Sequence, residues 1–169
     1  MGALLAKENI WYVGTQDPNL RVFDIIMHSD WGTSYNAYLV KGSEKTALFE
    51  TSKLEFFDEF LANVREVCDP ASIDYIVVDH TEPDHSGSLE KLLALAPNAT
   101  VLGSATALNF LKQIVNHEFA CRAVTEKDTV DLGGMTLHFL SVPFLHWPDS
   151  MYTYIPEAKA LFPCDSFGC

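Results

Sequence analysis

The sequence gathers side chains that can bind metal ions into one short segment, residues 79–88. This segment follows a continuously apolar run at 73–78, of the kind that forms a buried strand, and it precedes a helical pattern. A loop that leaves a buried strand can turn alternate side chains toward one volume, and a residue at the start of the next helix can point back to it. One histidine is usually structural, but several imidazoles and carboxylates at such a turn predict a metal site. The candidate ligands are His80, Glu82, Asp84 and His85.

Two later segments add one candidate ligand each. His146 follows an alternating run and is flanked by Trp147 and Pro148, which could shield a metal ion from water. Asp165 follows a short apolar run, and its carboxylate could bridge two metal ions. Taken alone, a single His or Asp after a strand is more often structural. Both residues nevertheless lie where ligand sites gather in α/β proteins, at the carboxyl ends of strands.

The ligand types limit which metal ion such a site would hold. Structural zinc sites favour cysteine and histidine in a closed tetrahedron, whereas the 80–85 cluster contains no cysteine and half of its ligands are carboxylates. Mixed imidazole and carboxylate ligation with open positions is typical of non-haem iron. The ligand types therefore favour iron and leave manganese and zinc open.

The hydrophobic patterns along the chain predict a mixed fold. Alternating or continuous apolar runs predict strands, and apolar residues at three- and four-residue spacing predict helices. The predicted strands cover 10–13, 32–40, 46–50, 73–78, 100–103, 135–142, 150–155 and 160–162. The predicted helices cover 53–67, a segment that runs to 96 with Ser86 or Ser88 as N-cap, and 105–115. This mixture of hairpins and strand–helix–strand units predicts packed sheets with helices outside them.

The composition is that of one globular domain, because 48% of the 169 residues are hydrophobic. With 23 acidic against 11 basic side chains, the net charge of −12 argues against nucleic acid and anionic membranes as partners. No stretch approaches the roughly 20 apolar residues of a membrane span, and the first residues lack a secretory signal, so a cytoplasmic location is predicted. The four cysteines form no C-x-x-C pair and are predicted to be free thiols.

Three motifs carry the candidate ligands: His80-x-Glu82-x-Asp84-His85-Ser86-Gly87, His146-Trp147-Pro148-Asp149-Ser150-Met151 and Asp165-Ser166-Phe167-Gly168. Together they resemble one known family, the flavodiiron proteins, also called A-type flavoproteins. The resemblance covers essentially the whole chain, and the segment Gly32 to Leu39 is also similar to the family. It implies an α/β (α+β) fold, a metallo-β-lactamase-like αββα sandwich over residues 1–169 that is incomplete at its C-terminus.

The resemblance also implies a role for each candidate ligand. One iron would be bound by His80, Glu82 and His146, and the other by Asp84 and His85, with Asp165 bridging the two. Members of the family reduce O2 to water, or NO to N2O, in the cytoplasm. Their electrons arrive through an FMN on a flavodoxin-like domain, often from rubredoxin, and in head-to-tail homodimers the FMN of one subunit faces the di-iron centre of the other.

The sequence departs from the family at its C-terminal end. In the family, the metallo-β-lactamase-like domain continues past the position equivalent to 169 and supplies a last His ligand to the second iron, and the flavodoxin-like domain comes after it. Neither is present here, so this chain alone is expected not to bind FMN. Because an incomplete sheet leaves unpaired edge groups, we expect a homo-oligomer, strand exchange or a second chain.

Two other functions remain open from the sequence. The first is a zinc-dependent hydrolase on the same fold, against which Glu82 argues because metallo-β-lactamase-type hydrolases carry His at that position. The second is a non-catalytic, truncated metal-binding module, which is motivated by the missing His ligand and flavin domain.

The remaining histidines and cysteines are weaker candidates. His28, near a segment typical of the family, could support the site from outside the ligand set, although a structural role is the default. His117 and His138 are expected to be a surface residue and a packed strand residue. Cys164 and Cys169 flank Asp165, but neither their spacing nor the family pattern supports them as ligands.

Overall fold

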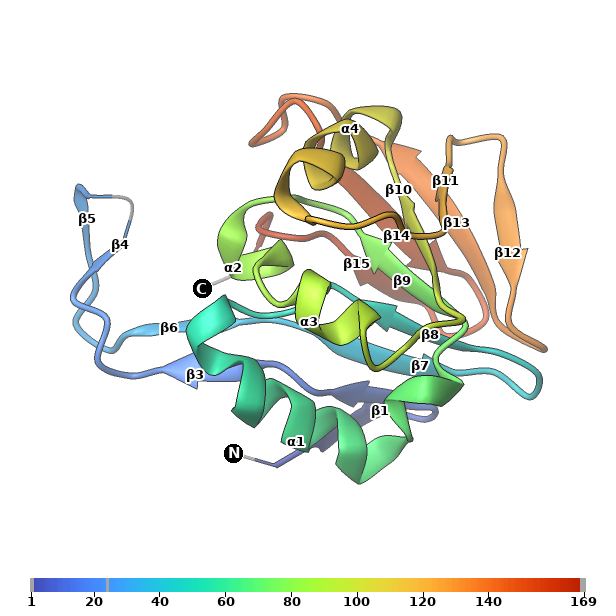
Figure 1. The fold of residues 1–169 in the computed structure, drawn as a ribbon, viewed down its shortest axis with the longest axis horizontal. Coiled ribbons are helices and arrows are strands. Elements are labelled where there is room, and N and C mark those ends of the chain that lie inside the picture. Colours follow the sequence, from blue (N-terminus) through green and yellow to red (C-terminus); the bar gives the residue numbers. More distant parts are fainter. Residues whose placement is uncertain (1, 24, 168–169) are drawn as a thin grey trace.

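A computed structural model of the protein describes residues 2–23 and 25–167. Across these residues two main β-sheets pack face to face (Figure 1). The larger, seven-stranded sheet has the order β1 (Leu4–Lys7), β2 (Ile10–Tyr12), β7 (Tyr38–Lys41), β8 (Thr46–Phe49), β9 (Tyr75–Val78), β10 (Thr100–Gly103) and β11 (Cys121–Ala123). The smaller, four-stranded sheet has the order β12 (Thr129–Asp131), β13 (Thr136–Ser141), β14 (Met151–Ile155) and β15 (Ala160–Phe162).

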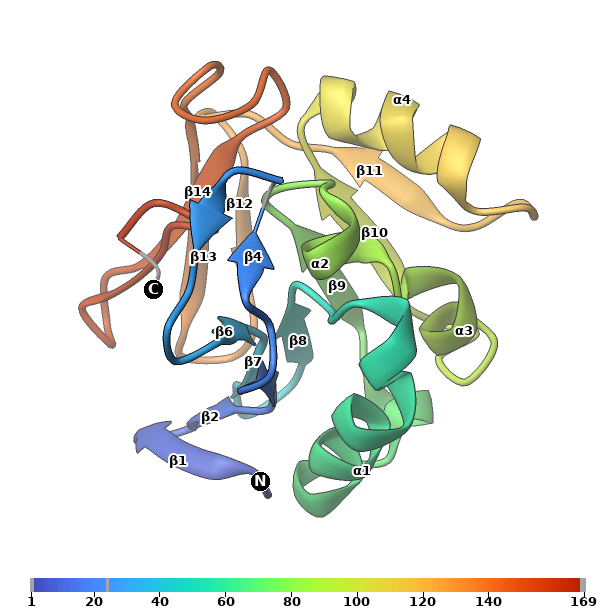
Figure 2. The same cartoon turned by 90° about the vertical axis from the view of Figure 1, so that its left-hand side faces the viewer.

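Helices cover one face of the larger sheet, and the smaller sheet covers the other face (Figure 2). The layers are therefore helix, sheet and sheet, as the sequence predicted for this part of the sandwich. No helix in the described residues is long and apolar enough to cross a membrane. The helical segments are η1 (Leu54–Phe56), α1 (Phe57–Val67), η2 (Pro70–Ser72), α2 (Pro83–Ser86), α3 (Leu89–Leu93) and α4 (Ala105–Ile114).

Strand β9 explains why the core has two halves. Its side chains alternate, so that Ile76 and Val78 pack under the helices while Val77 packs against the smaller sheet. All three are fully buried, and the parallel neighbours β8 and β10 flank the strand. The structure confirms the prediction of a strand buried on both faces, and it fixes where the chain leaves that strand at Asp79.

The prediction of one strand over 32–40 is wrong. Residues Thr33–Tyr35 form β6, which pairs with β3 (Thr15–Asp17), whereas β7 pairs with β2 and β8. The chain changes partners at Asn36 and so moves from one sheet to another, which the alternation of side chains does not reveal. Between β3 and β6, β4 (Val22–Phe23) and β5 (Met27–His28) form a hairpin that projects as an arm (Figure 1).

The prediction of one helix running to residue 96 is also wrong. The segment splits into α2 and α3 because Ser88 N donates to Ser52 O, at 2.9 Å, and the chain turns there. Ser88 occupies the N-cap position of α3, as one of the two predicted alternatives, although its side chain makes no capping hydrogen bond; Ser86 lies inside α2, whose N-cap position is held by Glu82. Strand β1 was not predicted, because all four of its residues are exposed and show no alternation.

The two main sheets also contact each other through two turns. One of these turns directly precedes β8, at the opposite end of the strand from the segment that contains Asp79. The backbone amides of Glu44 and Lys45 both donate to Leu132 O, at 3.1 and 3.0 Å. Gly42 belongs to the same turn, and a Cβ atom there would lie 1.8 Å from Leu132 O. Only a residue without a side chain lets these two turns approach so closely.

We therefore expect Gly42→Ala to lower the free energy of unfolding by about 1–3 kcal/mol, because the backbone of one turn must shift. Denaturant unfolding of the metal-free protein measures this loss. Gly2→Ala is the matched control, since its Cβ meets only the flexible end of Glu66. Equal stability of the two variants would contradict the close approach.

Candidate metal centre

All six predicted ligands come together at one end of the two sheets. The larger sheet contributes the segment that directly follows β9 and continues into α2. The smaller sheet contributes the loop between β13 and β14, which carries His146, and the segment after β15, which carries Asp165. The ligand atoms fall into two groups, each with its members within 4.8 Å of one another. The first group is His80, Glu82, His146 and Asp165, and the second is Asp84, His85 and Asp165.

In the first group the side chains converge on Glu82. Its Oε2 lies 3.1 Å from His80 Nε2 and 3.3 Å from His146 Nε2. Asp165 Oδ2 completes the group at 3.2 Å from His146 Nε2 and 3.9 Å from His80 Nε2. Two imidazoles and two carboxylates therefore face one small volume.

The second group uses the other oxygen of Asp165. Asp165 Oδ1 lies 2.6 Å from His85 Nε2, and Asp84 Oδ2 lies 3.7 Å from the same nitrogen. The Asp165 carboxylate thus presents one oxygen to each group, which is the arrangement that a bridging carboxylate requires. The bridging role of this residue between two ions stays a prediction.

Charge compensation holds the centre together. Burial raises the pKa of the Asp165 carboxyl, but the hydrogen bond from His85 and the nearby imidazoles outweigh burial, so the pKa is lowered. Burial lowers the pKa of His85, yet its hydrogen bond to Asp165 reverses the shift and raises it. Burial raises the pKa of Asp84. The site therefore favours a carboxylate at Asp165 beside a positively charged group, which a metal ion can replace.

The residues present fit a pair of metal ions. Asp84 Oδ1 is buried and has no hydrogen-bond partner among the described residues, although buried carboxylate oxygens are almost always paired. The donor set contains only imidazole nitrogens and carboxylate oxygens, and no cysteine belongs to either group in the part of the chain that the structure describes. That donor set suits iron, as the sequence suggested.

A cleft of about 420 Å³ leads to the centre. Asp84, His146 and Asp165 lie at its base, and Met27 and His28 line it from the arm. His28 is exposed and belongs to neither ligand group, so it lines the cleft without being a candidate ligand. A small molecule can reach the centre through this cleft.

The other sequence candidates belong to neither ligand group among the described residues. His117 is exposed and His138 is half-buried in β13, as expected. Cys68, Cys121 and Cys164 are free thiols. Cys169, one of the weak ligand candidates, lies outside the described residues.

Sequence reasoning missed three buried carboxyls around the ligands: Glu50, Asp79 and Asp149. Glu50 Oε1 accepts a hydrogen bond from Asp79 N at 2.8 Å, and Asp79 Oδ1 accepts one from Thr153 Oγ1 at 2.9 Å. Burial raises the pKa of both groups, and the charge of Glu50 raises that of Asp79 further. An acid directly after an apolar strand was the available signal, because both Glu50 and Asp79 occupy such positions.

Comparison with known proteins identifies the domain. A family model described as ODP family beta lactamase matches residues 33–169. The chain belongs to this family. Its fold is therefore the metallo-β-lactamase-like sandwich that the flavodiiron resemblance implied, and the arrangement of the sheets agrees with it.

Similar proteins of this family are named for flavin, iron and small-molecule reduction. The chain is 50% identical over 171 residues to a flavo-diiron protein of Clostridium acetobutylicum, covering 100% of this chain and 42% of that protein. It is 42% identical to a nitric oxide reductase of Moorella thermoacetica, covering 95% and 41%. The structure of rubredoxin oxygen:oxidoreductase from Desulfovibrio gigas superposes with a TM-score of 0.87 at 35% identity, covering 94% and 40%. The chain spans about two fifths of these relatives.

The Glu50–Asp79 pair predicts how stability depends on pH. A carboxyl whose pKa rises on folding costs stability as the pH climbs from its unfolded pKa of about 4 toward the raised value. We expect Asp79→Asn to raise the Tm of the metal-free protein at neutral pH, because it removes one buried charge and keeps the oxygen that Thr153 bonds. The rise in Tm should be about 2–4 °C for each kcal/mol of stability gained. It should vanish as the pH approaches the pKa of the Asp79 carboxyl in the unfolded chain.

Melting curves between acidic and neutral pH measure this effect. Asp58→Asn, at an exposed carboxyl on α1, provides the control and should leave the pH profile unchanged. A D79N protein that is less stable than wild type at neutral pH would show that the buried Glu50 and Asp79 carboxyls do not destabilise one another.

Proposed function

We propose that the domain binds two iron ions at its two ligand groups. His80, Glu82 and His146 hold the first ion, Asp84 and His85 hold the second, and Asp165 bridges them. The observation that carries the proposal is the orientation of Asp165, whose two oxygens face different groups at 3.2 Å from His146 and 2.6 Å from His85.

We further propose that the protein reduces O2 to water, NO to N2O, or both. The names of the similar proteins support this reaction class, since they include a nitric oxide reductase and a rubredoxin oxygen:oxidoreductase. Iron ions held by these residues would supply electrons for the reduction of a diatomic molecule, which a redox-inert zinc ion would not do. A centre with two ligand groups that share a carboxylate is what such a reaction needs.

The residues of the chain itself orient the ligands and control access. Trp147 packs its ring edge-on against His80, with the ring centroids 5.1 Å apart, and so covers a ligand that is fully buried. The cleft beside His28 is lined by Asp84 and His146 and so opens these side chains to a small substrate. Trp147 thus shields one ligand, and the cleft admits the diatomic molecule.

Electrons, in this proposal, come from an FMN on a flavodoxin-like domain that lies outside these 169 residues, with rubredoxin or a similar protein as donor. Large exposed apolar side chains in the arm segment and in the His146 loop, two segments that also contribute residues to the cleft lining, support a docking role for this face of the molecule. Ile25 and Trp31, on or beside the arm, are 92% and 91% exposed, and Phe144 in the His146 loop is 79% exposed. Isolated apolar residues are common on surfaces, but several around one cleft indicate an interface. A second copy of the protein is the proposed partner there.

A reconstitution assay tests the proposed reaction. The chain would be loaded anaerobically with ferrous iron, given a chemical reductant and exposed to NO or O2, with N2O formation and O2 consumption as readouts. Turnover by the iron-loaded protein but not by the zinc-loaded protein is expected. Hydrolysis of a thioester by the zinc-loaded protein, without reduction of either gas, would instead support the zinc hydrolase.

Removal of the bridge should reduce metal content. We expect Asp165→Ala to lower iron from two ions per chain toward one or none, since each group loses a carboxylate oxygen. Elemental analysis of anaerobically loaded protein measures the content. Glu118→Ala, at an exposed acid beyond α4, should keep both ions. Two ions in D165A would exclude the bridging role.

Exchange of Glu82 should change which metal ion is preferred. Glu82→His replaces a carboxylate by an imidazole, so we expect the ratio of zinc to iron bound from an equimolar mixture to rise. Nitrogen-rich ligand sets suit zinc better than mixed sets with carboxylate. An unchanged or lower ratio would show that this residue does not set the preference.

A further inference from the structure

His80 can serve the first ligand group only if its ring is held in one orientation. Each imidazole has two nitrogens, and the one that is not a ligand usually donates a hydrogen bond that fixes the ring. In His80, Nε2 faces Glu82 at 3.1 Å, while Nδ1 points away from the ligand group and lies 3.3 Å from Asp149 Oδ2. The His80 side chain is fully buried, so water does not compete for Nδ1.

Asp149 is a buried acceptor for His80 and for the residue that follows it. Its Oδ2 accepts hydrogen bonds from Thr81 N and from Thr81 Oγ1, both at 2.8 Å. An oxygen that already accepts two hydrogen bonds acts as an acceptor toward His80 as well, so Nδ1 must carry the hydrogen. The side chain of Asp149 is 0% exposed, which leaves little freedom to move. In the neutral ring with its hydrogen on Nδ1, the lone pair of Nε2 faces the first ligand group and can bind a metal ion.

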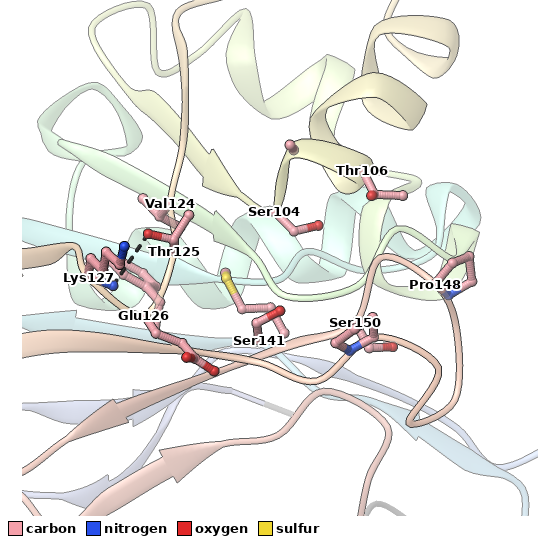
Figure 3. Close-up of a pocket in the computed structure, with 13 residues that line it drawn as sticks. Ser104, Thr106, Val124, Thr125, Glu126, Lys127, Ser141, Pro148 and Ser150 are labelled. Carbon is pink, nitrogen blue, oxygen red and sulfur yellow. Dashed lines mark hydrogen bonds between the residues drawn. The ribbon is translucent and has the colours of Figure 1, made fainter.

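A hydrogen bond from Ser104, the N-cap residue of α4, holds the backbone of Asp149. Ser104 Oγ donates to Asp149 O at 2.9 Å, and the same hydroxyl oxygen accepts a hydrogen bond from Ala107 N at the start of α4. Ser104 and Ser150 both line a cavity of about 650 Å³ (Figure 3). None of the six candidate ligands lines this cavity. The carboxylate of Asp149 is held separately, by Thr81 and His80, so its contacts do not require the Ser104 hydrogen bond.

Asp149 also connects two segments that are far apart in the sequence. It lies three residues after His146, in a loop where His146 and Phe144 have φ angles of 103° and 65°. Such values are strained for residues other than glycine and persist only where neighbouring contacts enforce them. The hydrogen bonds to Thr81 and His80 tie this strained loop to the segment after β9. One carboxylate thus sets the orientation of one ligand and the position of the loop that carries another.

We propose that Asp149 is a positioning residue of the metal centre: its buried carboxylate holds His80 with Nε2 toward the first ligand group and ties the His146 loop to the same segment. The proposal rests on the proposed role of His80 and His146 as ligands. Loss of a partner of this kind typically lowers metal affinity about 10–100-fold.

Asp149→Asn tests the role with little change in shape. The amide oxygen can still accept from Thr81, but the negative charge that holds the His80 ring is gone. Affinity would be measured with Co²⁺ as the probe, by competition with a chelator, and the exchangeable Nδ1 proton of His80 would be followed by NMR in the Co²⁺-loaded protein. We expect D149N to bind Co²⁺ about 10–100-fold more weakly and its Nδ1 proton to exchange faster with water.

Ser104→Ala is the matched control. It removes a hydrogen bond to the backbone of Asp149 and leaves the carboxylate intact, so it should lower the Tm of the metal-free protein while Co²⁺ affinity stays near that of wild type. Wild-type affinity in D149N would overturn the positioning role. So would equal losses of affinity in D149N and S104A that follow their losses in Tm, because both would then be effects of folding. A wild-type protein that binds no Co²⁺ would instead refute the proposed metal site, and this role with it.

Discussion

Carboxylates and imidazoles share one buried volume in this protein, and they do so only because they neutralise one another. An ionised side chain removed from water carries a large desolvation cost unless an opposite charge or hydrogen bonds compensate it. Asp165 meets His85 with one oxygen and His146 with the other, and Asp149 meets His80. Each segment that reaches the centre must therefore place its side chain within hydrogen-bonding reach of a partner on another segment. The rest of the architecture follows from that requirement.

The partners come from opposite sheets. His80 and His85 follow β9 of the larger sheet, whereas His146, Asp149 and Asp165 lie in segments next to β14 and β15 of the smaller sheet. The centre is thus formed where two separately hydrogen-bonded layers meet, and neither layer could compensate the buried charges alone. The two halves of the core meet at the alternating side chains of β9 and so fix the position of one layer relative to the other.

The sequence predicted features well where the residues that define them are neighbours in the chain. His80 to His85 stood out because their ligand types are adjacent in sequence, and the strand at 73–78 because its apolar run is continuous. His146 and Asp165 gained weight only from the family resemblance, since one ligand after one strand is not specific. The partners Glu50, Asp79 and Asp149 could not be assigned, because their roles depend on contacts across 29 to 74 positions. The break between α2 and α3 arose likewise from a distant backbone contact, Ser88 N to Ser52 O.

The contact between turns at Gly42 has a consequence for how the protein opens. The turn that contains it precedes β8, whereas Glu50 follows that strand, so the backbone bonds to Leu132 and the ligand groups lie at opposite ends of the two sheets. At the end with the ligand groups, bonds such as Met151 N to Asp79 O also join the sheets, but several carboxyls are buried together there. Without a bound cation, that end is therefore expected to open before the Gly42 end. In hydrogen–deuterium exchange, amides beside the centre would lose protection first, and amides near Gly42 would lose it only with global unfolding.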